Sequence, residues 1–239
     1  MKNNQNPDYK ALAELETMKN ARNYNKWIWE EIRPEVGAKA LEIGAGIGTF
    51  TEFLKEEREV TATDIGENCL EILRNKYRKS TNIKIEYLDI TSINNPAIRE
   101  TQFDSVIALN VIEHISDDIK ALKNIDGLLK PGGKAIIMVP AFQFAYGTID
   151  KLDGHYRRYR KNELVNKMNE AGFTAIKAKY FNSIGLLAWY YTNKIARNSS
   201  TSRTKVKIYD SSVVPFISKA ERLITPPFGQ SVIAIGEKR

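Results

Sequence analysis

The feature that most constrains the fold of this chain is a regular alternation of short apolar segments with segments of helical periodicity. Strands are predicted at 39–43, 59–64, 83–88, 103–109 and 134–139. Helices are predicted between them from about Thr49, over 68–77 and over 117–129. Because strands and helices alternate and the last two strands are mostly apolar, the pattern indicates an α/β parallel sheet covered by helices on both faces.

The segments that flank this alternation complete a single predicted domain, residues 1–239. Asp8 to Arg33 is expected to be helical, and Ala141 to Tyr159 is expected to be a polar and aromatic loop. A helix at 162–171, a strand at 174–180 and a last strand at 231–237 follow. Phe181 to Gln230 is interpreted as an insertion before the last strand, apolar at both ends and polar at 198–202.

Composition and charge say more about the cellular compartment of the protein than about its function. A single cysteine, Cys69, and an N-terminus without a signal-peptide pattern favour a reducing cytoplasm. No apolar stretch approaches the roughly 18 residues of a membrane span. The net charge of +7 suits nucleic acid, an anionic membrane surface or an anionic substrate, and it equally suits plain solubility.

The sharpest local pattern is LEIGAGIGTF at positions 41–50, where a strand feeds a glycine turn and then a helix. Gly44, Gly46 and Gly48 give GxGxG spacing, which differs from the GxGxxG of dinucleotide-binding folds. Glu42 would sit badly beside a pyrophosphate, but a carboxylate suits the ammonium and sulfonium of S-adenosylmethionine (SAM). The turn therefore favours SAM, and a dinucleotide-dependent oxidoreductase is the alternative from another class.

Acidic residues end the next two strands. Asp64 follows Gly44 by 20 positions, the separation expected of an acid that accepts hydrogen bonds from ribose hydroxyls. Asp89 could accept the adenine amino group while Ile90 packs on the ring. Helix capping is the alternative role for both acids. Asn110 ends the fourth strand beside the same crevice.

Taken in order, LEIGAGIGTF, Asp64, LDI at 88–90, FDSVIALNVIEHI at 103–115 and LLKPGGKAIIMVP at 128–140 resemble the class I SAM-dependent methyltransferases. The similarity is to the small-molecule group that includes the ubiquinone-pathway methylases, and it covers about residues 20–180 and the last strand. It implies a Rossmann-like, seven-stranded, mostly parallel sheet whose final strand is antiparallel.

The resemblance also implies a cofactor site. Glycines of the turn and Glu42 would surround the methionine part of SAM, Asp64 the ribose, Asp89 and Ile90 the adenine, and Asn110 the amine or sulfonium side. Tyr24 and Trp27, in a helix before the first motif, resemble residues that close over SAM, and simple packing is their alternative. The full predicted cofactor set is Tyr24, Glu42, Gly44, Ala45, Gly46, Gly48, Asp64, Ile65, Asp89, Ile90, Asn110 and Val111.

The loop after the fifth strand supplies the candidates for chemistry. It contains DKLDGHYRRY at 150–159, and we predict that His155, Tyr156 and Arg158 face the methyl acceptor. An arginine there would suit a substrate carboxylate or phosphate. The alternative is a structural loop in which the arginines pair with Asp150 or Asp153.

No metal site is expected. Some quinone O-methylases carry an acidic residue, two spacers and then Glu-His in the region of Glu113 and His114, and they bind a divalent metal there. The first of these positions is Asn110 in this chain, so a cofactor-side or structural role for His114 is expected instead.

The acceptor is expected to be a small molecule or lipid-linked. A nucleic-acid methyltransferase is the alternative within methyl transfer, although the end of the fourth strand lacks the Asn/Asp-Pro-Pro-aromatic signature of amino-methylating enzymes. A SAM-binding protein without activity is also open. The insertion at 181–230 is expected to act as a lid, with peripheral membrane contact, plain packing and a dimer interface as open alternatives. The oligomeric state stays open.

Overall fold

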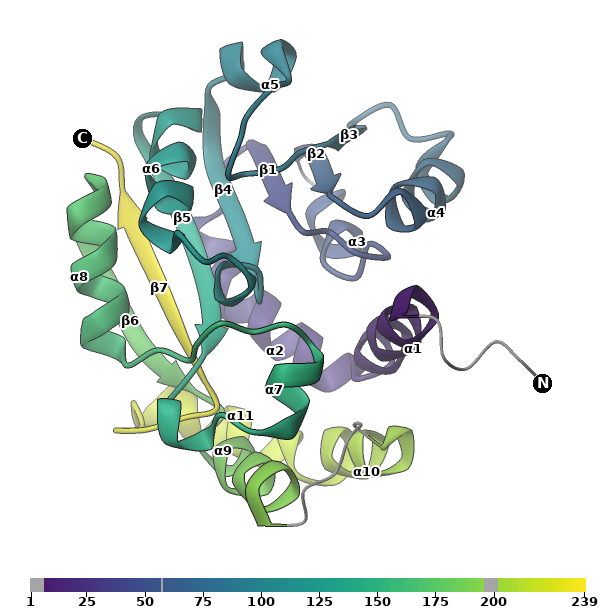
Figure 1. Ribbon diagram of the computed structural model, residues 1–239, viewed down its shortest axis with the longest axis vertical. Coiled ribbons are helices and arrows are strands. Elements are labelled where there is room, and N and C mark those ends of the chain that lie inside the picture. Colours follow the sequence, from purple (N-terminus) through teal and green to yellow (C-terminus); the bar gives the residue numbers. More distant parts are fainter. Residues whose placement is uncertain (1–6, 57, 196–201) are drawn as a thin grey trace.

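The computed structural model describes residues 7–56, 58–195 and 202–239, and it is organised around one seven-stranded sheet (Figure 1). The strands are β1 (Lys39–Ile43), β2 (Glu59–Asp64), β3 (Ile83–Tyr87), β4 (Phe103–Leu109), β5 (Leu129–Pro140), β6 (Thr174–Phe181) and β7 (Ser231–Glu237). They lie in the order β3-β2-β1-β4-β5-β7-β6. Most of the polar stretch predicted at 198–202, with Arg197 beside it, lies outside the described residues.

The direction of the strands determines where a ligand can bind. Neighbouring strands from β3 to β5 pair in parallel, whereas β7 is antiparallel to both β5 and β6. The predicted Rossmann-like fold is therefore confirmed, including its antiparallel last strand. The carboxyl ends of β1 to β4 meet at one edge of the sheet, which is where open α/β sheets bind ligands.

Two hydrophobic cores lie on opposite faces of the sheet, because the central strands are apolar on both sides. In β4, Val106 belongs to one core and Ile107 to the other. Leucines of α6 (Asp118–Leu128) and α8 (Lys161–Ala171) cover the first face, with α5 (Pro96–Glu100) beside them. The second face is covered by α2 (Arg22–Ile32), α3 (Thr51–Leu54) and α4 (Glu67–Tyr77).

The N-terminal region forms two helices, α1 (Pro7–Lys19) and α2, where one was predicted from Asp8 to Arg33. The chain turns at Asn20 and Ala21. The Asn20 side-chain amide donates to the Glu16 carbonyl (2.8 Å), and the Ala21 amide donates to the Met18 carbonyl (3.0 Å). These bonds use carbonyls at the end of α1 and let α2 leave in a new direction. A short 3₁₀ turn, η1 (Arg33–Glu35), follows α2.

The predicted loop at 141–159 is more ordered and more buried than its polarity suggested. It contains a 3₁₀ turn, η3 (Gln143–Ala145), and a helix, α7 (Thr148–Leu152). Asp150 and Tyr159 have no exposed surface. Their polar atoms are all used inside the protein, so this segment is a packed wall of the structure.

The insertion forms α9 (Ser183–Tyr190), a π-helical turn η4 (Tyr191–Ile195), α10 (Arg203–Ser212) and α11 (Val214–Leu223). It lies at the bottom of Figure 1, below α7 and beside α2. The Asp210 carboxylate accepts hydrogen bonds from the Asn23 and Tyr24 amides (3.2 and 2.8 Å) and thereby caps α2. Within the described residues, no helix has the length and apolar character needed to cross a membrane.

Candidate functional site

An open pocket of about 880 Å³ lies at the carboxyl ends of β1 to β4. Its volume is in the range of small-molecule sites. Residues from α1, from each strand end and from the 141–159 loop line it. The predicted site residues in this lining are Gly44, Gly46, Asp64, Ile65, Asp89, Ile90, Asn110, Val111 and Tyr156.

The glycine turn after β1 requires glycine for two separate reasons. Gly44 and Gly46 have φ angles of 68° and 56°, in the left-handed region that side chains disfavour. In addition, a Cβ on Gly44 would lie 2.6 Å from Val111 Cγ2, and one on Gly46 would lie 3.1 Å from Leu15 Cδ2. The turn can therefore fit beneath Val111 and α1 while keeping its backbone open to a ligand.

Asp64 connects the glycine turn to the end of β2. One carboxylate oxygen accepts from the Gly46 amide and the other from the Gly66 amide, both at 2.8 Å. Each carboxylate oxygen has a second lone pair, so Asp64 can still accept hydrogen bonds from a ligand in the pocket. The capping alternative for Asp64 does not hold, because Gly66 is the N-cap of α4 and no side chain caps that helix.

Asp89 and Asn110 stand at the two sides of the pocket. Asp89 Oδ1 accepts from the backbone amide and the hydroxyl of Thr91 (2.8 and 2.7 Å), which holds the carboxylate at the strand end. Buried Ile90 follows it. Asn110 is left-handed, with φ of 55°, and a non-glycine residue in this region often marks a functional turn.

Three predicted cofactor residues lie behind the pocket wall and are not part of its lining. Glu42 is buried and accepts a hydrogen bond from the Thr51 hydroxyl (2.6 Å). Burial raises the pKa of Glu42 to about 7, mainly because the charged form is desolvated. Ala45 is buried, and Gly48 lies against Leu73 and Tyr77. These residues shape the turn from below.

Tyr24 lies away from the pocket, so its predicted place in the cofactor site needs correction. Its ring packs 5.9 Å from that of Phe181 and 6.5 Å from that of Trp27. Burial raises the pKa of Tyr24 to about 12. Tyr24, which was predicted from the resemblance alone, belongs to the core between α2 and β6, so the packing alternative fits it better.

The loop residues divide into buried and accessible groups. Arg158 is buried, and its Nε donates to Asp150 Oδ1 (2.7 Å) while its guanidinium lies 4.8 Å above the Trp189 ring. Its predicted role toward the acceptor is therefore corrected to a structural one, because the charge is already paired with Asp150. Tyr156, at 59% exposure, does line the pocket.

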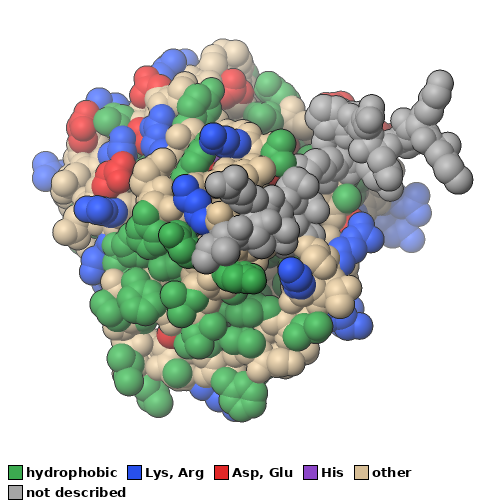
Figure 2. Space-filling model, turned by 60° about the horizontal axis from the view of Figure 1, so that its bottom comes forward, with side chains coloured by type: hydrophobic (Ala, Val, Ile, Leu, Met, Phe, Trp, Pro, Cys, Tyr) green, Lys and Arg blue, Asp and Glu red, His purple; other side chains and the backbone are tan. Residues whose placement is uncertain are grey.

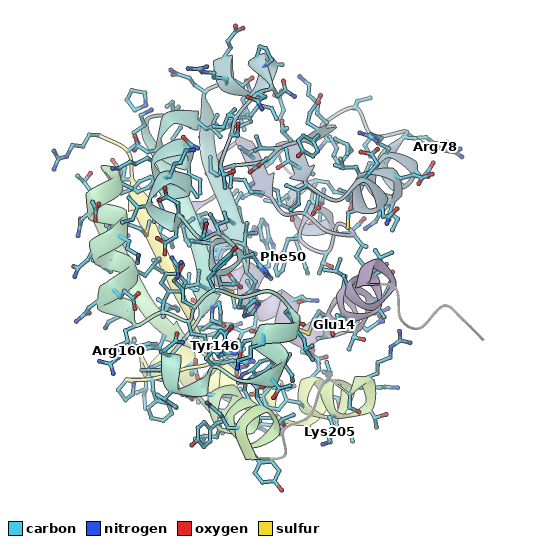
Figure 3. All side chains as sticks on the ribbon, in the orientation of Figure 1. Glu14, Phe50, Arg78, Tyr146, Arg160 and Lys205 are labelled. Atoms are coloured by element: carbon cyan, nitrogen blue, oxygen red, sulfur yellow. The ribbon has the colours of Figure 1, made fainter. Side chains whose placement is uncertain are left out.

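His155 is held by its own loop. Its Nδ1 lies 2.9 Å from Asp150 Oδ1, and its carbonyl accepts from the hydroxyl of Tyr146 (2.7 Å; Tyr146 is labelled in Figure 3). Only 11% of the His155 side chain is exposed. The second ring nitrogen, Nε2, is the atom left for chemistry.

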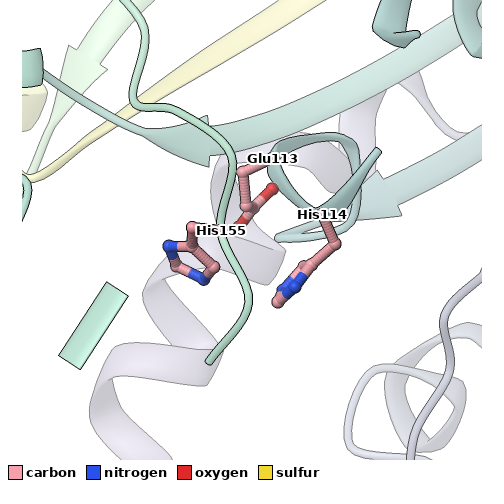
Figure 4. A group of neighbouring side chains, drawn as sticks. All are labelled: Glu113, His114 and His155. Carbon is pink, nitrogen blue, oxygen red and sulfur yellow. The ribbon is translucent and has the colours of Figure 1, made fainter. Parts of the chain in front are cut away.

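His155 belongs to a cluster with Glu113 and His114 of η2 (Ile112–His114) (Figure 4). The three side chains could hold a metal ion, because one ligand atom from each lies within 4.8 Å of the others. Burial raises the pKa of Glu113 to about 7. Nothing in the sequence indicates that His155 joins this pair, since 41 positions separate it from His114.

Several pocket residues were not predicted, among them Leu12 and Leu15 of α1 and Tyr87. His114, for which a cofactor-side or structural role was expected, also lines the pocket. The leucines were recognised only as helix positions, because nothing in the sequence shows that α1 lies over the glycine turn. For His114 the signal was its position, four residues after Asn110.

Residues 41–135 match the model of a family described as a methyltransferase domain. The chain is 26% identical over 148 residues to a ubiquinone biosynthesis O-methyltransferase of Vibrio vulnificus, covering 56% of this chain and 63% of that protein. It is 27% identical over 148 residues to a demethylmenaquinone methyltransferase of Staphylococcus haemolyticus, covering 58% and 61%. The chain thus spans a little under two thirds of the length of these curated relatives.

Solved structures share the fold. A SAM-dependent methyltransferase of Thermotoga maritima aligns with a TM-score of 0.63 at 18% identity, covering 92% of this chain and 91% of that one. A phosphoethanolamine N-methyltransferase of Haemonchus contortus, solved with S-adenosyl-L-methionine, aligns with a TM-score of 0.60 at 21% identity, covering 90% and 52%. The domain match and the fold confirm the resemblance predicted from the motifs.

Proposed function

We infer that this chain, which contains a methyltransferase domain, is a SAM-dependent methyltransferase that acts on a small-molecule or lipid-linked acceptor. The observation that carries this proposal is the pocket, in which the open glycine turn, Asp64 and Asp89 line one continuous wall. The family match at 41–135 and the curated relatives support the same activity.

The order of the strands matches the order of chemical groups in SAM. Along the sheet edge, β3, β2, β1 and β4 present Asp89, Asp64, Gly44 and Asn110 respectively. Three strand spacings of about 4.8 Å give a track of about 14 Å, long enough for an extended nucleoside with an amino-acid tail. Adenine would lie at Asp89, ribose at Asp64, and the methionine part at the glycine turn.

The reaction itself needs alignment more than a nucleophilic side chain. The acceptor atom attacks the sulfonium methyl group, a bond from the acceptor to carbon forms, and the carbon–sulfur bond breaks to leave S-adenosylhomocysteine. Where the acceptor atom bears a hydrogen, that proton leaves to a base or to solvent. With SAM on the β3–β1 side and Asn110 beside its sulfonium, His114 and Tyr156 are among the pocket residues on the acceptor side.

The acceptor class follows from the relatives and from the surface. Both curated relatives described above are quinone-pathway methyltransferases by name. A nucleic-acid acceptor is less well supported, because β4 is followed by Asn110-Val111-Ile112-Glu113 and lacks the Asn/Asp-Pro-Pro-aromatic signature of amino-methylating enzymes.

We further propose that the insertion brings this acceptor from an anionic membrane surface. Figure 2 shows hydrophobic side chains gathered on the face formed by the bottom of the molecule in Figure 1. We call it the lower apolar face. The exposed hydrophobic residues of the elements at this end are Phe144, Ile184, Leu187, Tyr190, Tyr191, Ile208, Phe216, Leu223, Ile224 and Phe228. Exposed Lys194, Lys205 and Lys219 on the same insertion would pair with lipid phosphates.

The membrane proposal is tested by co-sedimentation with vesicles of phosphatidylglycerol and phosphatidylcholine. Binding to the anionic vesicles should weaken when Leu187 and Phe216, exposed by 62% and 75%, are both changed to Gln. Ile72→Gln, which changes an exposed hydrophobic residue of α4 away from this face, is the control. No binding of the parent at low salt would exclude the membrane, and equal binding by all variants would exclude this face.

The catalytic proposal is tested by titration calorimetry with SAM and with NAD, followed by transfer of labelled methyl groups to extracted lipids, small molecules and nucleic acids. SAM should bind and NAD should not. Label in the lipid or small-molecule pool supports the acceptor class, and label confined to nucleic acid overturns it.

A further inference from the structure

Glu113 is a buried carboxylate whose side-chain oxygens accept no hydrogen bond from the described residues. Its side chain has no exposed surface. A buried charge is costly unless it is paired with a counter-charge or binds a metal ion. The fold tolerates this arrangement at the end of β4, next to the pocket, so the carboxylate is a candidate ligand for a cation.

Two imidazoles point toward the same space (Figure 4). The His114 and His155 rings lie edge to face, with centroids 4.6 Å apart and planes at 87°. Glu113 and His114 are adjacent on η2, whereas His155 comes from the 141–159 loop, whose Tyr156 amide donates to the Glu113 carbonyl (2.8 Å). That backbone hydrogen bond holds the two segments together.

A second layer of residues orients His155. Asp150 accepts from His155 Nδ1, which directs Nε2 toward Glu113 and His114. Arg158 balances the Asp150 charge, and the Asn193 side-chain amide donates to the other Asp150 oxygen (2.8 Å). A histidine that donates its rear N–H to a carboxylate is the usual arrangement at metal sites.

We propose that Glu113, His114 and His155 form a binding site for a transition-metal ion of the Zn²⁺ type. Metal bonds to these ligands are about 2.0–2.2 Å, so ligand atoms of one ion lie about 3–4 Å apart. The present limit of 4.8 Å is closed by side-chain movements of about 1 Å. Two imidazoles and one carboxylate select Zn²⁺, Co²⁺ or Fe²⁺ over Mg²⁺, which prefers oxygen ligands.

This site differs from the one considered and rejected from the sequence. That pattern needed an acidic residue at position 110, where this chain has Asn110. The third ligand is instead His155, brought in by the fold from the loop after β5. In this chain the imidazole of His155 therefore takes the place of the carboxylate that the pattern requires at position 110.

The position of the site suggests a role for the ion in methyl transfer, and this part of the proposal rests on the proposed function. His114 lines the pocket, so an ion with three protein ligands would keep open positions toward the acceptor side. An acceptor oxygen or nitrogen could occupy one of them, which would favour loss of its proton. Ion binding itself needs neither SAM nor acceptor and can be measured alone.

The test titrates chelator-treated protein with Zn²⁺ by calorimetry, and with Co²⁺ by visible absorption. One ion per chain should bind at micromolar or lower concentration, and Mg²⁺ should not compete. Glu113→Gln and His155→Gln should each weaken binding at least about tenfold, and Asp150→Asn by about 10–100-fold. Cys69→Ser, which removes the chain's single thiol, is the control and should bind as the parent does.

A second measurement needs no variant, in case the substitutions disturb folding. The chain has two histidines, so modification by diethyl pyrocarbonate can be mapped to His114 and His155 by mass spectrometry. Zn²⁺ should protect both. Absence of stoichiometric binding by the parent overturns the proposal, as does unprotected His114 in the presence of Zn²⁺. Parent-like affinity in folded Glu113→Gln and His155→Gln would do the same.

Discussion

Removal of the Asp64 carboxylate is the most direct test of the cofactor site. Asp64 lines the pocket, and its two oxygens already accept from the Gly46 and Gly66 amides. The ribose hydroxyls of SAM would use the remaining lone pairs. A hydrogen bond to a charged group contributes about 1.5–3 kcal/mol, so Asp64→Ala should weaken SAM binding about tenfold to a hundredfold.

The assay is titration calorimetry with SAM, with thermal unfolding of the free proteins in parallel. Asp104→Ala is the matched control, because the Asp104 carboxylate also accepts a backbone amide, that of Lys39 (2.7 Å), but lies outside the pocket. Both variants should lose some stability, and only Asp64→Ala should lose affinity. Parent-like SAM affinity in folded Asp64→Ala would refute the ribose assignment.

Three further predictions concern other parts of the site. The raised pKa of Glu42, about 7 against an ordinary 4.5, stabilises the folded protein below pH 4.5 relative to high pH, by roughly 3 kcal/mol, and this stability is lost as pH rises through 7. Glu42→Gln should therefore flatten the fall in melting temperature between pH 5 and pH 8; an unchanged fall contradicts the assignment. His155→Ala should reduce turnover by about tenfold or more while SAM affinity stays within about twofold, and parent-like turnover would remove the loop from the active site. Asn193→Ala should lower turnover, because the Asn193 side-chain amide donates to Asp150. Asn82→Ala is the control, since the Asn82 side-chain amide donates to backbone carbonyls away from the site, and it should leave turnover unchanged. Equal effects of the two variants on turnover would show that Asn193 only stabilises the fold.

Apolar content was enough to predict the central strands, because a strand buried on both faces is mostly apolar. Phe103–Leu109 was predicted with the bounds that the structure shows. β5 begins earlier than predicted, at Leu129, because Pro131 and the glycines after it were interpreted as a helix stop. Leu129 nevertheless pairs with Phe103 across an irregular register. At this position, pairing with β4 determined the structure more strongly than the local preference of Pro131 and the glycines for a turn.

Polarity was a poorer guide than apolar content at the candidate site. Arg158 and Asp150 were expected on an accessible loop, but each satisfies the other in the interior. The sequence allowed the arginines to pair with Asp150 or Asp153 as an alternative, but it could not show that the Arg158–Asp150 pair is buried, because burial depends on the fold. For the same reason the meeting of His155 with Glu113 could not be predicted.

The placement of β7 between β5 and β6 has a consequence for the order in which the protein is assembled. β6 has β7 as its sheet neighbour, and β7 is made more than 50 positions later than β6 begins. During synthesis β6 must therefore wait beside an unfinished sheet edge until Ser231–Glu237 leaves the ribosome. The cap that Asp210 places on α2 spans 187 positions and is equally late. The β1–β5 part of the sheet can form first, and the insertion closes onto the N-terminal helices as one of the last steps of folding.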